Sequence, residues 1–216
     1  GANGAGKTTT LNAIAGTLPI AGGELLYAGQ RIEKLPAHKR LRQGLALVPE
    51  GRGIFTRLTV LDNVAMAVQS RARDWGTSFS FWKPFSLDSA IIDEAHALLA
   101  QVSLTGMATR LGGQLSHGEQ RSLEVALALA TQPKLLLLDE PMAGMGSEES
   151  ERMVELIEHL AQRVTILLVE HDMDAVFRLA DRISVLVGGT VIASGSPEAI
   201  RADAEVRRAY LGDDAT

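Results

Sequence analysis

Cysteine is absent from this 216-residue sequence, which excludes disulfide bonds, thiol catalysis and thiolate metal sites. The five histidines include no H-E-x-x-H motif and no close pair with the spacing of metal ligands. Long hydrophobic runs are also missing, since none approaches the roughly 18 to 20 residues of a membrane span. No signal peptide opens the chain. We therefore expect a soluble domain inside the cell.

Positive charge is in deficit. The chain carries 21 Lys and Arg against 26 Asp and Glu, a formal net charge of -5, so we expect no nucleic acid partner. Hydrophobic residues make up 46% of the chain and charged residues 22%, which is the balance of a globular protein with a core. The length suits one large domain, or a core with a subdomain.

Short apolar segments alternate with segments of helical periodicity along most of the chain. This alternation predicts an α/β fold with a parallel sheet covered by helices on both faces. Residues 50–110 mostly show helical periodicity, and an aromatic segment at 74–84 within them contains both tryptophans. We therefore interpret residues 50–110 as a helical insertion. The core is then formed by residues 1–49 and 111–216, as parts of one domain. Ser147 is the expected N-cap of one core helix. The predicted strands are 24–27, 45–48, 135–138, 165–169, 183–187 and 191–193, and the predicted helices are 8–15, 59–70, 87–102, 116–130, 148–162 and 173–180.

The first ten residues, GANGAGKTTT, fit the phosphate-binding pattern G-x-x-x-x-G-K-[ST]. Small residues let consecutive backbone N–H groups turn toward phosphate oxygens, and the helix that starts near Lys7 adds the positive end of its dipole. Lys7 is expected to reach the β- and γ-phosphates, and Thr8 to give a hydroxyl oxygen to Mg²⁺. The alternative is a glycine-rich turn before an ordinary helix. The residues expected to hold the nucleotide are Asn3, Gly4, Ala5, Gly6, Lys7, Thr8 and Thr9.

The segment LLLLDEP contains a fully apolar strand followed by two carboxylates, Asp139 and Glu140. They should lie at the carboxyl end of the strand, where open α/β sheets bind ligands. Asp139 is suited to the Mg²⁺ shell, directly or through water, and Glu140 to polarising an attacking water. Taken alone, the segment can also be a strand that ends at solvent. The phosphate-binding loop upstream favours the functional interpretation.

Two further segments have both a structural and a functional interpretation. In LSHGEQ, Ser116 and Glu119 form a capping box for the following helix. A helix N-terminus with a serine and a glycine is also an anion site. In LLVEHD, His171 follows a strand that is expected to lie beside the strand of Asp139. It is either a satisfied structural histidine or a sensor that hydrogen-bonds the γ-phosphate.

In this order and spacing, the four motifs resemble those of the ATP-binding subunits of ABC transporters, over essentially the whole chain. Residues 1–8 look like the Walker A loop of that family, 135–140 like the Walker B strand, 115–119 like the signature and His171 like the switch histidine. The phrases VPEGRGIFTRLTVLDNV, LLLLDEPMAGM and VEHDMDAVFRLADRISVL are similar to the importer branch for branched-chain amino acids. The urea and amide relatives of that branch share these phrases.

The resemblance implies a P-loop NTPase fold of the ABC type, with a RecA-like parallel sheet core and an inserted helical subdomain. It implies ATP and Mg²⁺ as ligands, with Glu140 as the base for hydrolysis and His171 beside it. ABC ATPase domains pair head to tail, so the signature of one subunit meets the nucleotide held by the other. This adds a second set of expected nucleotide-binding residues, namely Ser116, His117, Gly118 and Glu119.

The resemblance also implies partners and a place in the cell. The expected partners are a second ABC ATPase subunit, the transmembrane permease subunits onto which the helical subdomain docks and, indirectly, a solute-binding protein. The place is the cytoplasmic face of the bacterial inner membrane, where the chain would be peripheral. The transported solute does not touch the ATPase, so these residues do not define it.

Three positions depart from the family pattern. Glu50 stands where a glutamine often contacts Mg²⁺ or water, so it is a candidate metal ligand and a candidate catalytic residue. His117 replaces the second signature glycine, which narrows the space near phosphate. Gly146 stands where the family usually has aspartate, so contact across the dimer must come from backbone there.

Two other functions are compatible with the motifs. A soluble ABC ATPase that acts on nucleic acid or ribosomes is disfavoured by the acidic balance and by the lack of coiled-coil heptads and of a tandem second domain. The other is an inactive fragment, because the sequence has neither the strand that normally precedes the phosphate-binding loop nor the aromatic residue that stacks on adenine. We expect a chain truncated at its amino end, with its first strand missing. Intact Lys7, Asp139, Glu140 and His171 indicate that the parent is active.

Overall fold

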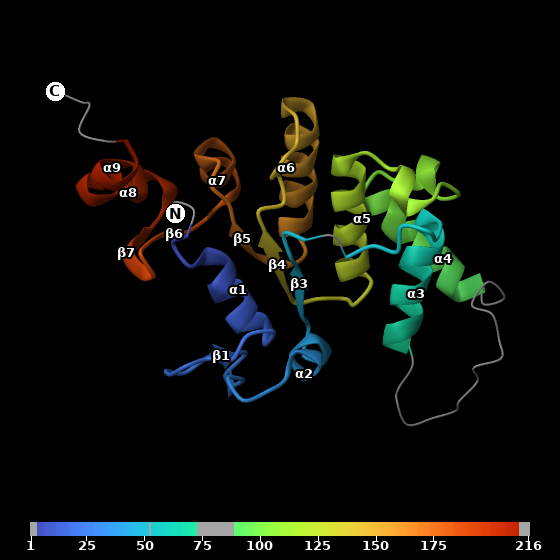
Figure 1. The fold of residues 1–216 in the computed structure, drawn as a ribbon, viewed down its shortest axis with the longest axis horizontal. Coiled ribbons are helices and arrows are strands. Elements are labelled where there is room, and N and C mark those ends of the chain that lie inside the picture. The colour runs from blue at the N-terminus through green and yellow to red at the C-terminus, as the bar shows by residue number, and fades with distance from the viewer. Residues whose placement is uncertain (1–3, 52, 73–88, 212–216) are drawn as a thin grey trace.

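The computed structural model describes residues 4–51, 53–72 and 89–211. The aromatic segment at 74–84 therefore lies outside the described residues, and so does Asn3. Figure 1 shows the elements in order along the chain, with bounds as follows. They are α1 (Lys7–Ala15), β1 (Leu26–Tyr27), β2 (Gln30–Arg31), α2 (Ala37–Arg42), β3 (Leu45–Val48), α3 (Val60–Ala72), α4 (Ser89–Gln101), the 3₁₀ turns η2 (Thr105–Met107) and η3 (Gly112–Gln114), α5 (His117–Leu129), β4 (Leu135–Asp139), α6 (Ser147–Ala161), β5 (Thr165–Val169), α7 (Met173–Leu179), β6 (Ile183–Val187), β7 (Thr190–Gly195), α8 (Pro197–Ala202) and α9 (Ala204–Leu211).

A parallel sheet with the strand order β3-β4-β5 forms the centre of the molecule. Val48 pairs with Leu138 across the first pair of strands, and Asp139 pairs with Val169 across the second. This confirms the prediction of an α/β fold with parallel apolar strands. Because parallel strands end at the same edge of a sheet, the segments after β3, β4 and β5 begin side by side.

Helices cover both faces of this sheet, as the alternation of side chains in β4 shows. Leu137 packs with Leu11 of α1 on one face. Leu136 and Leu138 join a larger cluster on the other face, formed mainly by residues of α3, α4, α5 and α6. Since period-two alternation places alternate side chains on opposite faces, β4 contributes to both cores. Each fully buried leucine of this kind stabilises the fold by roughly 1.5–3 kcal/mol.

The structure differs from the sequence-based prediction in three local details. The last two strands, β6 and β7, form an antiparallel hairpin and do not extend the parallel order. The expected strand at 24–27 is reduced to β1, which pairs with β2 across a tight turn. Ser147 is the first residue of α6 and not its N-cap, a position that extended Gly146 takes without a side-chain hydrogen bond. Glu148 and Glu149 in the first turn offset the helix dipole instead.

A groove of about 720 Å³ lies between β5 and β6. In the described part of the chain, β5 pairs with β4 and β6 pairs with β7, so the facing edges of the two sheets are not joined. The groove is lined by apolar residues of both strands, among them Leu167, Val169 and Val185, and reaches Lys7.

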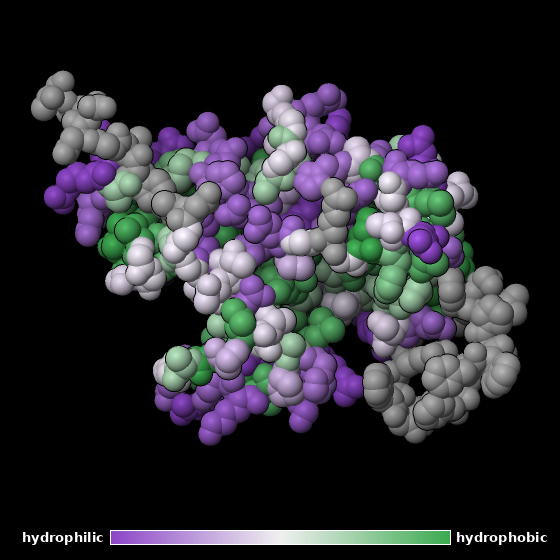
Figure 2. Space-filling model, viewed as in Figure 1, coloured by the Kyte–Doolittle hydropathy of each residue, from purple (hydrophilic) through white to green (hydrophobic). Residues whose placement is uncertain are grey.

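Two groups of elements lie at opposite ends of the molecule (Figure 1). Figure 1 shows α3, α4 and α5 together at one end, while α8, α9 and the β6–β7 hairpin form the other. Figure 2 shows hydrophobic residues (green) at the hairpin end, where Val187 and Val191 are exposed. Within the described ranges, no helix is both long and apolar enough to cross a membrane. The division into a core and a helical subdomain at 50–110 stays a prediction.

Arg40 of α2 fastens the phosphate-loop helix to the segment that follows it. Its side chain is 2% exposed. The guanidinium donates to the carbonyls of Ala13 and Ile14 at 2.7 Å each, in the last turn of α1, and to that of Leu35 at 2.8 Å. A helix leaves its last carbonyls without intrahelical partners. Arg40 therefore supplies donors to carbonyls near the end of α1, of which that of Ala13 also accepts from the Gly16 N–H at 3.3 Å.

We expect Arg40→Ala to lower the free energy of unfolding by about 3 kcal/mol or more, because several half-buried carbonyls lose a charged donor and a buried side chain is removed. Arg42→Ala, on the same helix but exposed, is the matched control and should change it by less than about 0.5 kcal/mol. Urea denaturation of both variants measures the difference. Equal midpoints for the two variants would contradict the role of Arg40.

Candidate nucleotide site

The loop before α1 has the backbone of a phosphate cradle. Gly4 and Gly6 adopt left-handed conformations, with φ of 80° and 95°, which only glycine adopts without strain. Between them, Ala5 is buried and its carbonyl accepts a hydrogen bond from the Gly189 N–H at 3.0 Å. Gly6 makes no side-chain cap at the start of α1. The β6–β7 turn therefore holds a loop that leads directly into a helix N-terminus.

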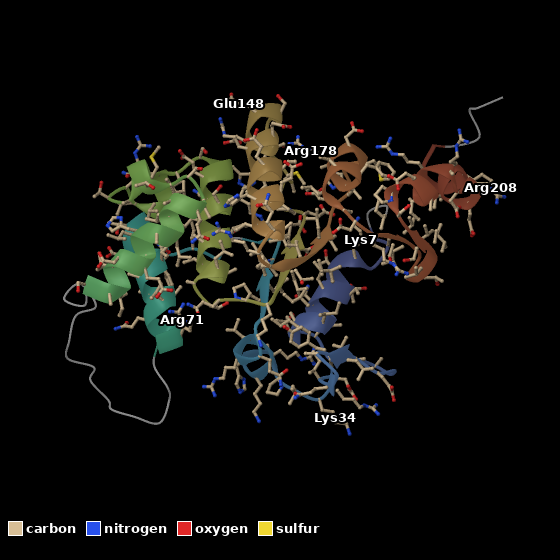
Figure 3. All side chains as sticks on the ribbon, turned by 180° about the vertical axis from the view of Figure 1, so that it is seen from behind. Lys7, Lys34, Arg71, Glu148, Arg178 and Arg208 are labelled. Atoms are coloured by element: carbon tan, nitrogen blue, oxygen red, sulfur yellow. The ribbon has the colours of Figure 1, made fainter. Side chains whose placement is uncertain are left out.

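A row of charged side chains lies beside this loop. Figure 3 shows Lys7 at the start of α1, next to the strand ends. Its Nζ is 3.5 Å from Oε1 of Glu140, and Nδ1 of His171 is 3.4 Å from Oε2 of the same carboxylate. The Lys7 and Glu140 side chains are only 11% and 13% exposed. Three residues singled out in three separate motifs are thus brought together.

Glu140 has a constrained backbone. Its φ is 45°, in the left-handed region that a residue with a side chain rarely adopts. The Glu140 N–H donates to the carbonyl of Val169 on β5 at 2.9 Å, which holds the turn after β4. Such strain persists where surrounding contacts determine the conformation, and it clusters at functional sites. Here it directs the carboxylate toward Lys7 and His171.

Asp139 is the last residue of β4 and is almost completely buried. Thr8 Oγ1 donates to its Oδ1 at 3.2 Å, so two of the three expected Mg²⁺ ligands are in contact. Burial raises the pKa of the Asp139 carboxyl; the Thr8 hydrogen bond opposes this, and the nearby charges of Glu140 and Glu50 raise the pKa further. Glu50 itself is exposed after the end of β3. The three carboxylates thus lie at one edge of the sheet.

The signature residues contact a different part of the chain. Ser116 caps α5 and Glu119 completes the capping box, as predicted. The Ser116 hydroxyl also donates to Oε1 of Glu149 at 2.9 Å. Gly118 faces the same carboxylate, since a Cβ there would lie 3.0 Å from it. Nε2 of His117 lies 3.0 Å from the carbonyl of Ala143 in the turn after β4. These contacts fasten the start of α5 to the start of α6 and to that turn.

Sequence reasoning missed two buried charged groups around the site. Glu170, with a fully buried side chain, accepts hydrogen bonds from the N–H groups of Met142 and His171, both at 3.0 Å. Arg121 of α5 donates to the carbonyl of Asp139 from beneath. Glu170 stands inside the recognised motif LLVEHD, and Arg121 directly follows LSHGEQ on the same helix. Their signal was a charged residue at a position where helical or strand periodicity requires an apolar one.

The residues present fit a magnesium–nucleotide complex. A glycine-rich loop at a helix N-terminus with a lysine provides donors for phosphate oxygens. Thr8 and Asp139 provide the hydroxyl and carboxylate oxygens that Mg²⁺ takes when phosphate supplies the other ligands. No group of three or more His, Cys, Asp or Glu side chains in the described part of the chain could hold a metal ion alone.

This fold and this loop define a P-loop nucleotide-binding protein. A family model described as ABC transporter matches residues 1–143. A second model, described as branched-chain amino acid ATP-binding cassette transporter, matches residues 190–216. The chain belongs to the ABC transporter family and is an ATPase of that family, as the four sequence motifs predicted.

Curated relatives cover nearly the whole chain. It is 38% identical to the high-affinity branched-chain amino acid transport ATP-binding protein LivG of Escherichia coli (strain K12), over 99% of this chain and 85% of LivG. The corresponding protein BraF of Pseudomonas aeruginosa is 37% identical, with the same coverage. The lipopolysaccharide export system ATP-binding protein LptB of Escherichia coli (strain K12) is 34% identical, over 99% of this chain and 84% of LptB.

Solved structures share the fold. The ADP conformation of MJ1267, an ATP-binding cassette of an ABC transporter, has a TM-score of 0.79 and 25% identity, over 98% of this chain and 85% of that one. The dimeric post-hydrolysis state of the cassette MJ0796, bound to ADP and Pi, has a TM-score of 0.75 and 23% identity, over 91% and 82%. Both likenesses confirm the ABC-type α/β architecture.

We expect Asp139→Asn to stabilise the nucleotide-free and magnesium-free protein at neutral pH. A carboxyl whose pKa is raised by folding contributes stability at low pH, and this contribution is lost as the pH rises through the folded pKa. Asparagine keeps an oxygen for the Thr8 hydroxyl but carries no charge. The stability difference between variant and wild type should therefore grow with pH above about 4, the usual pKa of aspartate.

Urea denaturation between acid and neutral pH measures this difference. Asp93→Asn, at an exposed position of α4, is the control and should show no comparable trend. A variant that loses stability relative to wild type as the pH rises would contradict the effect of burial on Asp139.

Proposed function

We propose that this chain is the ATP-hydrolysing subunit of a membrane importer for branched-chain amino acids or related amides. The carrying observation is the row Lys7–Glu140–His171 beside a phosphate-binding loop, in a member of the ABC transporter family. The solute class rests on the similarity to LivG and BraF. LptB, named for lipopolysaccharide export, is somewhat less similar.

The residues of the row have distinct roles in this proposal. Phosphate oxygens replace the Glu140 carboxylate as the partner of Lys7, which releases Glu140 to accept a proton from the attacking water. His171, held beside Glu140, hydrogen-bonds the γ-phosphate. Thr8, Asp139 and Glu50 hold Mg²⁺, which neutralises charge on the β- and γ-phosphates when bound. The loop residues Gly4, Ala5, Gly6 and Thr9, with Asn3, surround the phosphates.

A second ATPase subunit completes the site in this proposal. Ser116, His117, Gly118 and Glu119 of one subunit meet the nucleotide held by the other. The Ser116 hydroxyl now donates to Glu149, so that hydrogen bond breaks when the hydroxyl turns to a phosphate. The helical subdomain at 50–110 docks onto permease subunits at the cytoplasmic face of the membrane, and a solute-binding protein delivers the solute to them.

We expect Glu140→Gln in the full-length protein to bind ATP but to lose hydrolysis, with kcat reduced by about 100-fold or more because the general base is gone. Nucleotide affinity should stay equal or rise, since the Glu140 carboxylate no longer competes with phosphate for Lys7. Calorimetry measures binding and phosphate release measures turnover. Glu148→Gln, which changes an exposed carboxylate at the start of α6, is the control with normal turnover. Unchanged turnover in Glu140→Gln would refute the role of Glu140.

We expect the full-length protein to copurify with two hydrophobic permease subunits when it is expressed with its neighbouring genes. Proteoliposomes that contain the complex and the binding protein should take up leucine, isoleucine or valine only in the presence of ATP. Copurification with RNA or ribosomes, without permeases, would instead support the soluble alternative. Uptake of an unrelated solute alone would overturn the proposed solute class while leaving the ATPase assignment intact.

A further inference from the structure

Helix α5 carries a buried ion pair whose presence packing does not explain. Arg121 Nη1 and Glu124 Oε2 are 2.8 Å apart, and the two side chains are only 5% and 7% exposed. Burying two charges costs several kcal/mol per ion before their attraction offsets it, and apolar residues of similar volume often stabilise a fold as well or better. The neighbouring residues Leu123 and Val125 show that α5 is otherwise packed in the apolar way.

The pair makes further bonds to the strand ends that hold the site. The guanidinium of Arg121 donates through Nη1 to the carbonyl of Pro49 and through Nη2 to the carbonyl of Asp139. Glu124 Oε1 accepts from the N–H of Gly53 at 2.7 Å. One helix is thus fastened to the segment after β3, on both sides of Glu50, and to the end of β4.

The bond to Asp139 has a direct consequence for Glu140. The Asp139 carbonyl and the Glu140 N–H belong to the same peptide group. Arg121 donates to the oxygen of this peptide group, and the N–H of the same group donates to the carbonyl of Val169 at 2.9 Å. With both ends anchored, the plane of this peptide is determined, and it is the peptide that leads into the left-handed conformation of Glu140. Loss of the first anchor would let the plane turn and the carboxylate shift.

We propose that Arg121 and Glu124 are positioning residues that connect the signature helix to the reactive carboxylates. The same helix begins at the signature, where Ser116 is its cap. A displacement of α5 on contact with a second subunit is transmitted through this pair to the backbone beside Glu50 and Glu140. This inference rests on the proposed roles of those two carboxylates. It makes hydrolysis depend on the position of α5 while leaving phosphate binding at the loop unaffected.

Only an arginine satisfies this geometry. Its planar fork presents several N–H donors in fixed directions and can hold two carbonyls and a carboxylate at once. A lysine keeps the charge next to Glu124 but has a single nitrogen, which cannot reach both carbonyls in the same arrangement. The conservative change therefore separates the charge of the pair from its positioning role.

The test uses Arg121→Lys and the double variant Arg121→Met with Glu124→Met in the full-length protein. The double variant removes both charges and keeps the volume, so the buried pair is lost without an orphaned ion. The matched control is Arg71→Met with Glu94→Met. That pair also joins a guanidinium to a carboxylate and to a backbone carbonyl, that of Ala130, but lies between α3 and α4.

We measure the melting temperature, nucleotide affinity, KM and kcat per titrated nucleotide site, below the melting transition. We expect Arg121→Lys and the apolar double variant to lose at least about tenfold in kcat, with KM within about twofold, because a displaced base costs rate and not binding. The Arg71 and Glu94 control should keep kcat within about twofold of wild type. A purely structural pair would show full kcat per site in whatever fraction folds.

The outcomes separate this inference from the proposed function. Wild-type kcat per site in Arg121→Lys overturns the inference, even if the double variant fails to fold. Wild-type kcat in a folded double variant overturns it as well. If Glu140→Gln is inactive in either case, the proposed function stands and only the role of Arg121 falls. If Glu140→Gln is fully active, the role of Glu140 falls, and this inference falls with it.

Discussion

The register of the three parallel strands determines where Glu50, Glu140 and His171 lie. Because Val48 pairs with Leu138 and Asp139 with Val169, the three chain segments leave the sheet at one level. Glu50, Glu140 and His171 each follow the end of their strand by one or two residues. A shift of one residue in either pairing would turn each of these side chains to the opposite face. The contacts with the phosphate-binding loop would then be lost.

This edge of the sheet holds more negative than positive charge. Asp139, Glu140, Glu170 and Glu50 gather there, and Lys7 reaches one of them within 3.5 Å. Burial raises the pKa of the Asp139 carboxyl, and the nearby charges of Glu140 and Glu50 raise it further. In the proposed function, Thr8, Asp139 and Glu50 would hold Mg²⁺, whose charge would offset this repulsion, and phosphate would become the partner of Lys7. The free protein thus keeps in contact, at some electrostatic cost, groups that suit a metal and an anion together.

Much of this arrangement could be predicted from the sequence. The four leucines of β4, bounded by prolines, predicted a buried parallel strand, and the capping box of Ser116 and Glu119 predicted the start of α5. The antiparallel β6–β7 hairpin was missed although Gly188-Gly189, between the two apolar strands, is the signal of a two-residue hairpin turn. The cap of α6 was assigned to Ser147 because the preceding glycine has no side chain to signal an extended conformation. Glu170 and Arg121 could not be placed, since their hydrogen bonds go to backbone groups that only the fold brings near.

The buried charged groups missed by sequence reasoning all form hydrogen bonds with backbone groups. Glu170 accepts from two N–H groups, and the Arg121 fork donates to two carbonyls, so each joins segments that are distant in sequence. Burying such groups costs free energy, and hydrogen bonds to every polar atom offset that cost. A segment held in this way has one orientation, whereas apolar packing tolerates several. For Glu140, which we propose as the general base, a single orientation matters because a general base must stay within hydrogen-bond reach of the water it activates. The polar bonds beneath the sheet edge therefore contribute more to the geometry of the site than to the stability of the core.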